Sequence, residues 1–103
     1  MGNKAKTTSS NQTTCYVVAY DIPDDRRRTK VHKILQGFGK WTQYSLFECF
    51  LSRKELVQLR TKLSEHLIDK EDSVRFYPLC ANCIERVETV GGPPPTEDLL
   101  FVV

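Results

Sequence analysis

An apolar run that stops at a carboxylate and a proline constrains the fold of this chain more than any other stretch. Residues 16–20 read Tyr-Val-Val-Ala-Tyr, and Asp21, Ile22 and Pro23 follow at once. Such a run of β-branched and aromatic residues, bounded by a turn signal, is typical of a buried strand. The sequence therefore predicts a strand that ends at Asp21, so that its carboxylate lies at the end of a sheet.

A helix is predicted directly after this turn, over residues 25–38. Asp24 is placed to be its N-cap, and Gly37 and Gly39 are placed to end it. Its apolar residues recur at i, i+3, i+4 and i+7, which favours one stripe packed against a sheet. The residues of this stripe are Val31, Ile34, Leu35 and Phe38.

The same helix carries an intense positive cluster near its start. Three arginines in a first turn oppose the helix dipole, which prefers acidic residues there, so local stability does not explain them. Clustered guanidinium and ammonium groups neutralise phosphates, and this indicates a nucleic-acid contact. An alternative is a solvated helix face paired with Asp24 and Asp25, and the pattern favours neither. The cluster comprises Arg26, Arg27, Arg28, Lys30 and Lys33.

The rest of the chain alternates between strand and helix patterns. Residues 41–50 repeat with period two and predict one strand. Ser52 and Glu55 have the spacing of a capping box and begin a helix that runs to about residue 69. Further strands are predicted at 73–79 and 84–90. We expect an α+β ferredoxin-like βαββαβ sandwich, in which both helices cover one face of a four-stranded antiparallel sheet.

The two ends of the chain differ from its centre in composition. Residues 1–14 are polar and predict a disordered N-terminal arm, followed by one ferredoxin-like domain over residues 15–90. Residues 91–103 combine a Pro/Gly linker with an apolar end. We expect residues 99–103 to add an extra C-terminal strand to a second subunit, which makes the protein a homodimer. The alternative is that this segment folds back on its own sheet.

Composition and cysteine content exclude several classes of protein. The chain has 103 residues, a net charge of +2 and four cysteines, without a run of the roughly 20 apolar residues that span a membrane. Cysteines without an export signal indicate a reducing compartment, so a cytoplasmic location is expected. Cys80 and Cys83 are placed in the turn between the last two predicted strands. They are too few for a structural zinc site, and a redox pair lacks a strand-to-helix setting.

Asp21 is the first candidate for chemistry. A carboxylate at a strand end can bind Mg²⁺, which retains several waters and needs one or two protein carboxylates. One chain supplies too few ligands, whereas a two-fold axis near this residue would bring two copies together. The alternative interpretation is that Asp21 is a turn residue hydrogen-bonded to nearby backbone N–H groups. His32 and His66 fall on the predicted helices and are expected to face solvent.

Several motifs of this chain occur together in one known family of proteins. They are residues 20–25, Arg28 with Lys30, and residues 37–39, 43–48 and 74–80. With these motifs, residues 15–90 resemble Cas2, a family of small CRISPR-associated proteins. The resemblance implies a ferredoxin-like homodimer in which Asp21 faces its symmetry mate and binds Mg²⁺. It also implies metal-dependent endonuclease activity on RNA or on duplex DNA.

The resemblance also assigns roles to individual residues. Asp21 becomes the catalytic residue and metal ligand, with Tyr20 beside it. Arg28 becomes a contact to nucleic acid, and Ser45 and Phe47 lie near the same site. The residues that we expect to contact nucleic acid are Tyr20, Arg26, Arg27, Arg28, Lys30, Ser45 and Phe47.

Three functions remain open from the sequence. The first is a Mg²⁺-dependent endonuclease, an endoribonuclease or DNase, of CRISPR spacer acquisition. The second is a non-catalytic scaffold that binds duplex DNA and bridges dimers of the CRISPR integrase. It needs only positive helix faces along the duplex. The third is an RNA-binding module with Phe76 and Tyr77 stacking on bases, which ranks last because no glycine-aromatic signature surrounds them.

Overall fold

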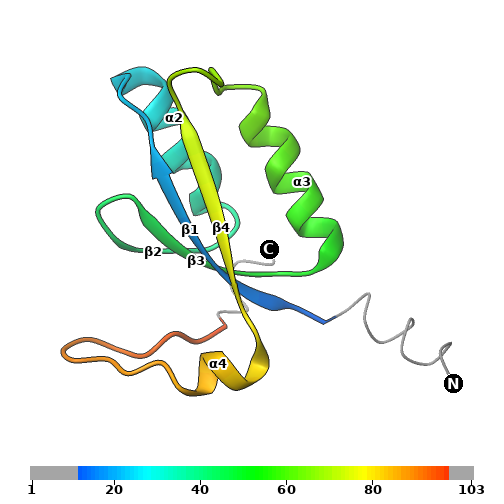
Figure 1. Cartoon of the computed structure of the whole chain (residues 1–103), viewed down its shortest axis with the longest axis vertical. Helices are drawn as coiled ribbons and strands as arrows, with labels where there is room; N and C mark the ends of the chain where they lie inside the picture. The colour runs from blue at the N-terminus through cyan, green and yellow to red at the C-terminus, as the bar shows by residue number, and fades with distance from the viewer. Residues whose placement is uncertain (1–11, 98–103) are drawn as a thin grey trace, which may run out of the picture.

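The structure is a computed structural model that describes residues 12–97 (Figure 1). Strands and helices follow one another in the βαββαβ order of the expected ferredoxin-like fold, with one short helix added after the last strand. The predicted α+β ferredoxin-like fold is therefore confirmed. In chain order the elements are β1 (Thr14–Asp21), α2 (Asp25–Gln36), β2 (Lys40–Gln43), β3 (Leu46–Leu51), α3 (Arg53–Ser64), β4 (Ser73–Leu79) and α4 (Ala81–Glu85).

All four strands form one antiparallel sheet in the order β2-β3-β1-β4 (Figure 1). In β1, Val18 lies between Phe47 of β3 and Phe76 of β4. The side chains of this row point to the face that α2 and α3 cover, and they form the core with the apolar stripes of both helices. The most deeply buried side chains are Val18, Val31, Leu35, Phe47, Cys49, Leu59 and Leu63.

Both long helices start as their sequences predict. Asp24 caps α2 by accepting a hydrogen bond from the backbone N–H of Arg27, at 2.9 Å. In α3, Ser52 and Glu55 form the expected reciprocal capping box. Both helices end earlier than expected. α2 ends at Gln36, with Gly37 as its C-cap. α3 ends at Ser64, and residues 65–72 form a loop before β4.

The single strand predicted over residues 41–50 is wrong, because this stretch folds into a β-hairpin. Tyr44 turns the chain with a φ of +45°, in the left-handed region. The indole Nε1 of Trp41 donates a hydrogen bond to the Tyr44 carbonyl at 2.8 Å and closes the turn. Before the hairpin, a Cβ on Gly39 would lie 2.4 Å from Cys49 Sγ, so only glycine fits where the two strands approach.

The strand predicted over residues 84–90 is also wrong. Cys80 is the N-cap of the short helix α4, and residues 86–97 form neither helix nor strand. The hairpin instead supplies a second strand between the two long helices, so the observed order is the βαββαβ of the expected fold, whereas the individually predicted elements run βαβαββ. α4 lies beyond the end of β4, far from α2 (Figure 1).

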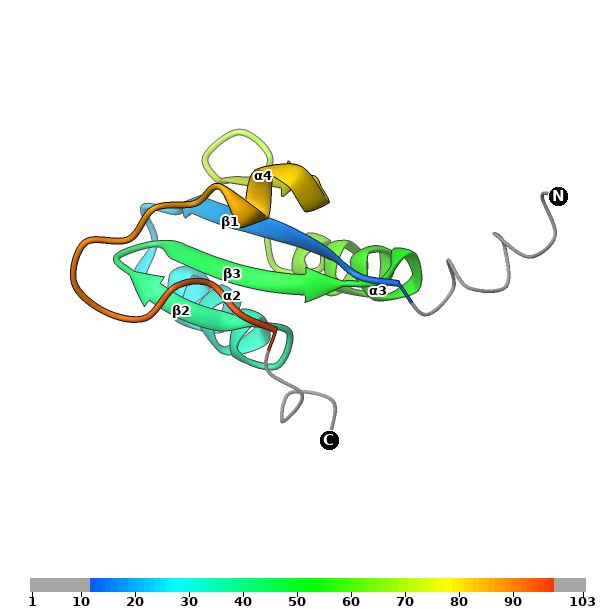
Figure 2. The ribbon, with the colours of Figure 1, turned by 90° about the horizontal axis from the view of Figure 1, so that it is seen from below.

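Residues 86–97 form a long loop that turns back toward the sheet (Figure 2). Its last residue, Glu97, accepts a hydrogen bond from Thr13 Oγ1 at 3.3 Å, so the loop returns to the start of β1. The predicted C-terminal strand and most of the predicted N-terminal arm lie outside the described residues. Within residues 12–97, no helix has the length and apolar character needed to cross a membrane.

Candidate nucleic-acid interface

Asp21 is the last residue of β1, where it pairs with Ser73 of β4, and its side chain is exposed. By strand alternation it shares a face with Val17 and Ala19, opposite the face that α2 and α3 cover. The carboxylate is therefore presented at the end of the sheet, on its uncovered side. The sequence predicts the position at the strand end, and the structure adds the face of the sheet.

Arg28 holds the chain that follows Asp21. Its Nη1 donates hydrogen bonds to the carbonyl oxygens of Ile22 at 2.8 Å and Pro23 at 3.3 Å. Its Nη2 forms an ion pair with the carboxylate of Asp25. In this conformation, the hydrogen-bonding groups of Arg28 stabilise the turn and do not project freely toward a phosphate.

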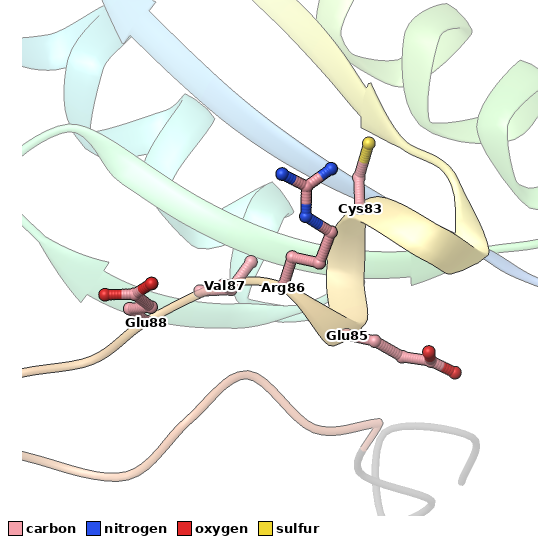
Figure 3. Close-up of a pocket in the computed structure, with 5 residues that line it drawn as sticks. All are labelled: Cys83, Glu85, Arg86, Val87 and Glu88. Atoms are coloured by element: carbon pink, nitrogen blue, oxygen red, sulfur yellow. The ribbon is translucent and has the colours of Figure 1, made fainter.

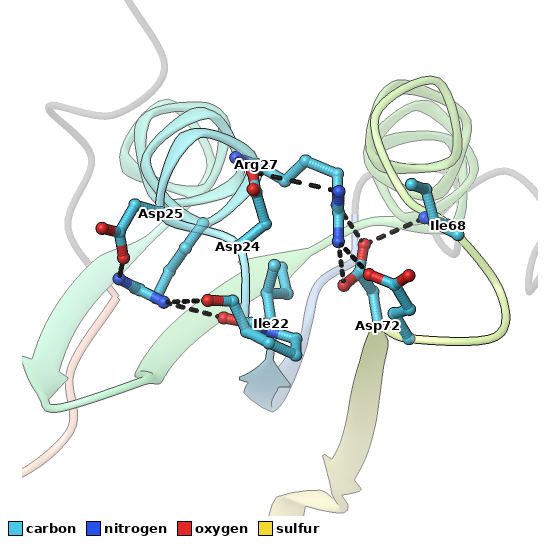
Figure 4. A network of polar contacts seen from close by, with 9 residues as sticks. Ile22, Asp24, Asp25, Arg27, Ile68 and Asp72 are labelled. Carbon is cyan, nitrogen blue, oxygen red and sulfur yellow. Dashed lines mark hydrogen bonds and ion pairs between the residues drawn. The ribbon is translucent and has the colours of Figure 1, made fainter.

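Arg27 has an even more complete set of protein partners (Figure 4). Its Nε donates to Asp72 Oδ2 at 2.7 Å, and its Nη2 donates to Asp72 Oδ1 at 3.1 Å and Glu71 Oε1 at 3.0 Å. The Asp72 side chain is fully buried and also accepts the N–H of Ile68 at 2.9 Å. These contacts connect α2 to the loop before β4, so the guanidinium of Arg27 is not available to a nucleic acid.

The hydrogen bonds between Arg27 and Asp72 change the acidity of the carboxyl group. The Arg27 guanidinium lowers the pKa of Asp72 below its ordinary value of 3.8, and the Ile68 N–H acts in the same direction. The pair is bidentate, and such pairs are among the stronger hydrogen bonds in proteins. Arg28 pairs with Asp25, as the solvated-face interpretation expects, whereas Arg27 pairs mainly with Asp72 and Glu71, which neither interpretation of the positive cluster includes.

The other three basic residues of α2 remain at the surface. Arg26, Lys30 and Lys33 are exposed and spaced at i, i+4 and i+7, which places them along one side of the helix. Within residues 12–97, none of these three side chains forms a hydrogen bond or an ion pair. We call Arg26, Lys30 and Lys33 the α2 basic stripe.

Tyr20 and Phe47, both predicted to contact nucleic acid, belong to the core. Phe47 is fully buried and Tyr20 is 7% exposed, so this chain does not present either ring to a nucleic acid, and the predicted contacts stay predictions. Burial raises the pKa of the Tyr20 hydroxyl, and a hydrogen bond with Ser45 partly opposes this shift. Ser45 itself is half-buried in the hairpin turn, where its carbonyl accepts the N–H of Tyr20 at 3.1 Å.

His32 is a residue of this region that the sequence pattern does not reveal. The sequence predicts it to face solvent, but its Nδ1 is 2.9 Å from the Tyr20 hydroxyl. Its ring also contacts Trp41 and Phe47, with centroid distances of 6.1 and 5.0 Å. His32 lies next to the apolar stripe of α2 in the sequence, and this position was the available signal. Tyr20 supplies a hydrogen-bond partner for the half-buried imidazole.

A metal site needs more ligands than one described chain brings together. Among residues 12–97, no three His, Cys, Asp or Glu side chains are close enough to hold a metal ion. Asp21 is a single accessible carboxylate at a strand end, which suits a cation such as Mg²⁺ that keeps most of its waters. The site therefore fits Mg²⁺ only if a second copy contributes its own Asp21.

Comparisons with known proteins all lead to one family. The family model described as CRISPR associated protein Cas2 matches residues 14–87. The CRISPR-associated endoribonuclease Cas2 3 of Synechocystis sp. is 48% identical over 82 residues, which are 80% of this chain and 89% of that protein. The crystal structure of Streptococcus pyogenes Cas2 has a TM-score of 0.66 at 34% identity, and the match covers 75% of this chain and 99% of that one. A chain of a partial Cas6-RT-Cas1–Cas2 complex has a TM-score of 0.68 at 26% identity, covering 82% of this chain and 92% of that one.

Proposed function

Because this chain belongs to the family of the CRISPR-associated protein Cas2, we propose that it acts in CRISPR adaptation as a homodimer that binds nucleic acid. Relatives of this chain carry the name of endoribonuclease, and one structural neighbour is part of a complex that contains Cas1. The proposed protein partner is accordingly the CRISPR integrase. The proposed ligand is the phosphate backbone of a duplex.

The α2 basic stripe is the observation that carries this proposal. Arg26, Lys30 and Lys33 are exposed along one side of α2, and within the described residues no carboxylate neutralises them. Cations in this state attract phosphates and release condensed counterions on binding. In a two-fold dimer the stripe occurs twice, so it can contact a duplex at two places without reading its bases.

Salt dependence of binding tests this interface. In the variant Arg26→Gln/Lys30→Gln, duplex binding weakens, and the slope of log affinity against log salt becomes shallower by roughly 0.9 for each phosphate that the protein no longer neutralises. Fluorescence anisotropy with a labelled duplex at several salt concentrations measures both quantities.

The control is Arg53→Gln/Lys54→Gln, which removes the same two charges from exposed positions at the start of α3. Its slope should stay close to that of the unchanged protein. If the two double variants lose affinity and slope equally, binding is a property of net charge, and the assignment to α2 is overturned.

A nuclease activity at Asp21 is the second function, and the exposed strand-end carboxylate favours it. Bound Mg²⁺ would supply charge stabilisation at the phosphate and lower the pKa of a water molecule. The chain's own contribution is to hold one Asp21 from each copy at the two-fold axis, on turns that Arg28 stiffens. We propose no general base from these residues, so slow turnover is expected.

Replacement of the carboxylate separates catalysis from binding. Asp21→Asn should abolish Mg²⁺-dependent cleavage of labelled RNA and DNA, weaken Mg²⁺ binding measured by calorimetry, and leave duplex affinity almost unchanged. Asp69→Asn removes an exposed carboxylate elsewhere and should change none of the three. Cleavage by Asp21→Asn at the rate of the unchanged protein would refute the catalytic role of Asp21.

A further inference from the structure

Cys80 and Cys83 lie together where the chain leaves β4 and enters α4. Cys80 is the N-cap of α4, and its Sγ accepts a hydrogen bond from the backbone N–H of Cys83 at 3.3 Å. Both are free thiols, and both residues are exposed. This is the strand-to-helix setting for a thiol pair that the sequence pattern does not reveal.

The other two cysteines have the opposite environment. Cys15 and Cys49 are buried at 3% and 0% exposure, and burial raises the pKa of their thiols to about 11 and about 12. The hydrogen bond from Cys83 instead lowers the pKa of the Cys80 thiol. Because the thiolate is the reactive form, Cys80 is the most reactive of the four cysteines at neutral pH.

Solvent reaches this pair without any change in the fold. Cys83 lines a shallow surface hollow together with Glu85, Arg86, Val87 and Glu88 (Figure 3). Within residues 12–97, no third His, Cys, Asp or Glu joins the two thiols to complete a metal site. Two neighbouring, exposed thiols suffice for a two-electron oxidation that joins their sulfurs. A structural zinc site needs four ligands, and the pair supplies only two of them.

We propose that Cys80 and Cys83 are a redox-active dithiol, which low-molecular-weight disulfides oxidise reversibly to an intramolecular disulfide bond. The Cys80 thiolate attacks one sulfur of the disulfide RSSR, forms a mixed disulfide and releases RS⁻. Cys83 then loses its proton to solvent and attacks Cys80 Sγ, which forms the Cys80–Cys83 bond and releases a second RS⁻. The two cysteines are oxidised by two electrons, and RSSR is reduced to two RSH once the thiolates take up the released protons.

Oxidised glutathione tests this proposal on the full-length protein. After incubation, the remaining free thiols are alkylated in denaturant and counted by mass spectrometry. The unchanged protein should lose two of its four alkylatable thiols and carry no bound glutathione, and dithiothreitol should restore all four. Stable glutathione adducts, disulfides between chains, or four unreacted thiols would each overturn the proposal.

Single variants distinguish the roles of the two thiols. Cys83→Ser should stop at the mixed disulfide on Cys80, whereas Cys80→Ser should react several-fold more slowly because it lacks the thiol whose pKa is lowered. The double variant Cys80→Ser/Cys83→Ser keeps only the buried Cys15 and Cys49 and should resist oxidation while folded. Equal reaction of the double variant and the unchanged protein would assign the reactivity to the core cysteines and refute the proposal.

Discussion

The structure separates two adjacent arginines into two different roles. Arg26 and Arg27 are neighbours in α2, but successive positions on a helix point about 100° apart. Arg26 consequently reaches solvent, whereas Arg27 reaches the buried carboxylate of Asp72. The charge of a side chain therefore does not predict its role in this cluster, because the role depends on which residues lie opposite each position.

Loss of the Arg27 side chain should destabilise the fold. Arg27→Gln leaves the buried Asp72 carboxylate without its charged partner, and we expect the melting temperature at pH 7 to fall by several degrees. The folded-state pKa of Asp72 lies below 3.8, so the pair stabilises the protein above that pH, and the contribution is lost as the pH falls further. The difference between the variant and the unchanged protein should therefore shrink below about pH 4.

Urea denaturation at a series of pH values measures this difference. The matched control is Arg26→Gln, which removes the same charge one position earlier and should leave stability almost unchanged. A difference between Arg27→Gln and the unchanged protein that stays constant down to pH 3 would contradict the role of the Asp72 carboxylate.

Among the elements, the hairpin of β2 and β3 is the one whose turn the sequence pattern did not predict. Residues 43–45 read Gln-Tyr-Ser and contain none of the glycine, proline or asparagine residues that usually mark a turn. Alternation continues across them, so the pattern indicates one long strand. The turn is formed instead by Tyr44 in a left-handed conformation, supported by the hydrogen bond from the Trp41 indole.

The left-handed backbone of Tyr44 predicts that glycine is more stable than alanine at this position. Left-handed backbone costs a residue with a Cβ about 1–2 kcal/mol, a cost that glycine avoids. Tyr44→Gly should therefore be more stable than Tyr44→Ala by about 1 kcal/mol, since neither variant keeps the exposed tyrosine ring. Urea denaturation of both variants gives the difference, and equal stability would contradict the assignment of strain to this residue.

At the scale of the whole molecule, the sheet face that no helix covers is the face on which a second copy would bring its Asp21 to the candidate metal site. Val17 and Ala19 are half-buried on this face, and Tyr77 of β4 is 47% exposed. Burial among these strands raises the pKa of Glu48, which pairs with Val17 in the register. A second copy on this face would bury the apolar side chains, and a two-fold axis there could bring two Asp21 residues together.

A charge on this face should therefore prevent dimer formation. Val17→Asp places a carboxylate beside Glu48, and we expect sedimentation equilibrium to show a monomer with unchanged circular dichroism. Val57→Asp is the matched control, because Val57 is 60% exposed on α3, outside the proposed interface. A dimer of unchanged affinity in Val17→Asp would exclude this face as the interface. Exchange of residues 99–103 between subunits stays a separate prediction outside the described residues.

Much of the fold could be predicted because it depends on local patterns. The apolar run before Asp21, the stripe of α2 and the capping box of Ser52 each involve residues close in sequence, and each forms the expected element. The strand predicted at residues 84–90 failed because alternation does not show whether a neighbouring strand is present to pair with it. The place of Asp21 at a strand end was predictable for the same reason as β1 itself.

The sequence by itself determined the fold class, the C-terminal end of β1 and the starts of both long helices, because propensity, capping and periodicity act over a few residues. Only the tertiary structure decided which cations remain at the surface and that Tyr20 and Phe47 pack in the core. Such outcomes depend on contacts like that of Arg27 with Asp72, 45 residues apart. A long-range contact leaves no periodic signal in the sequence, so its effect on charge and burial appears only once the chain is folded.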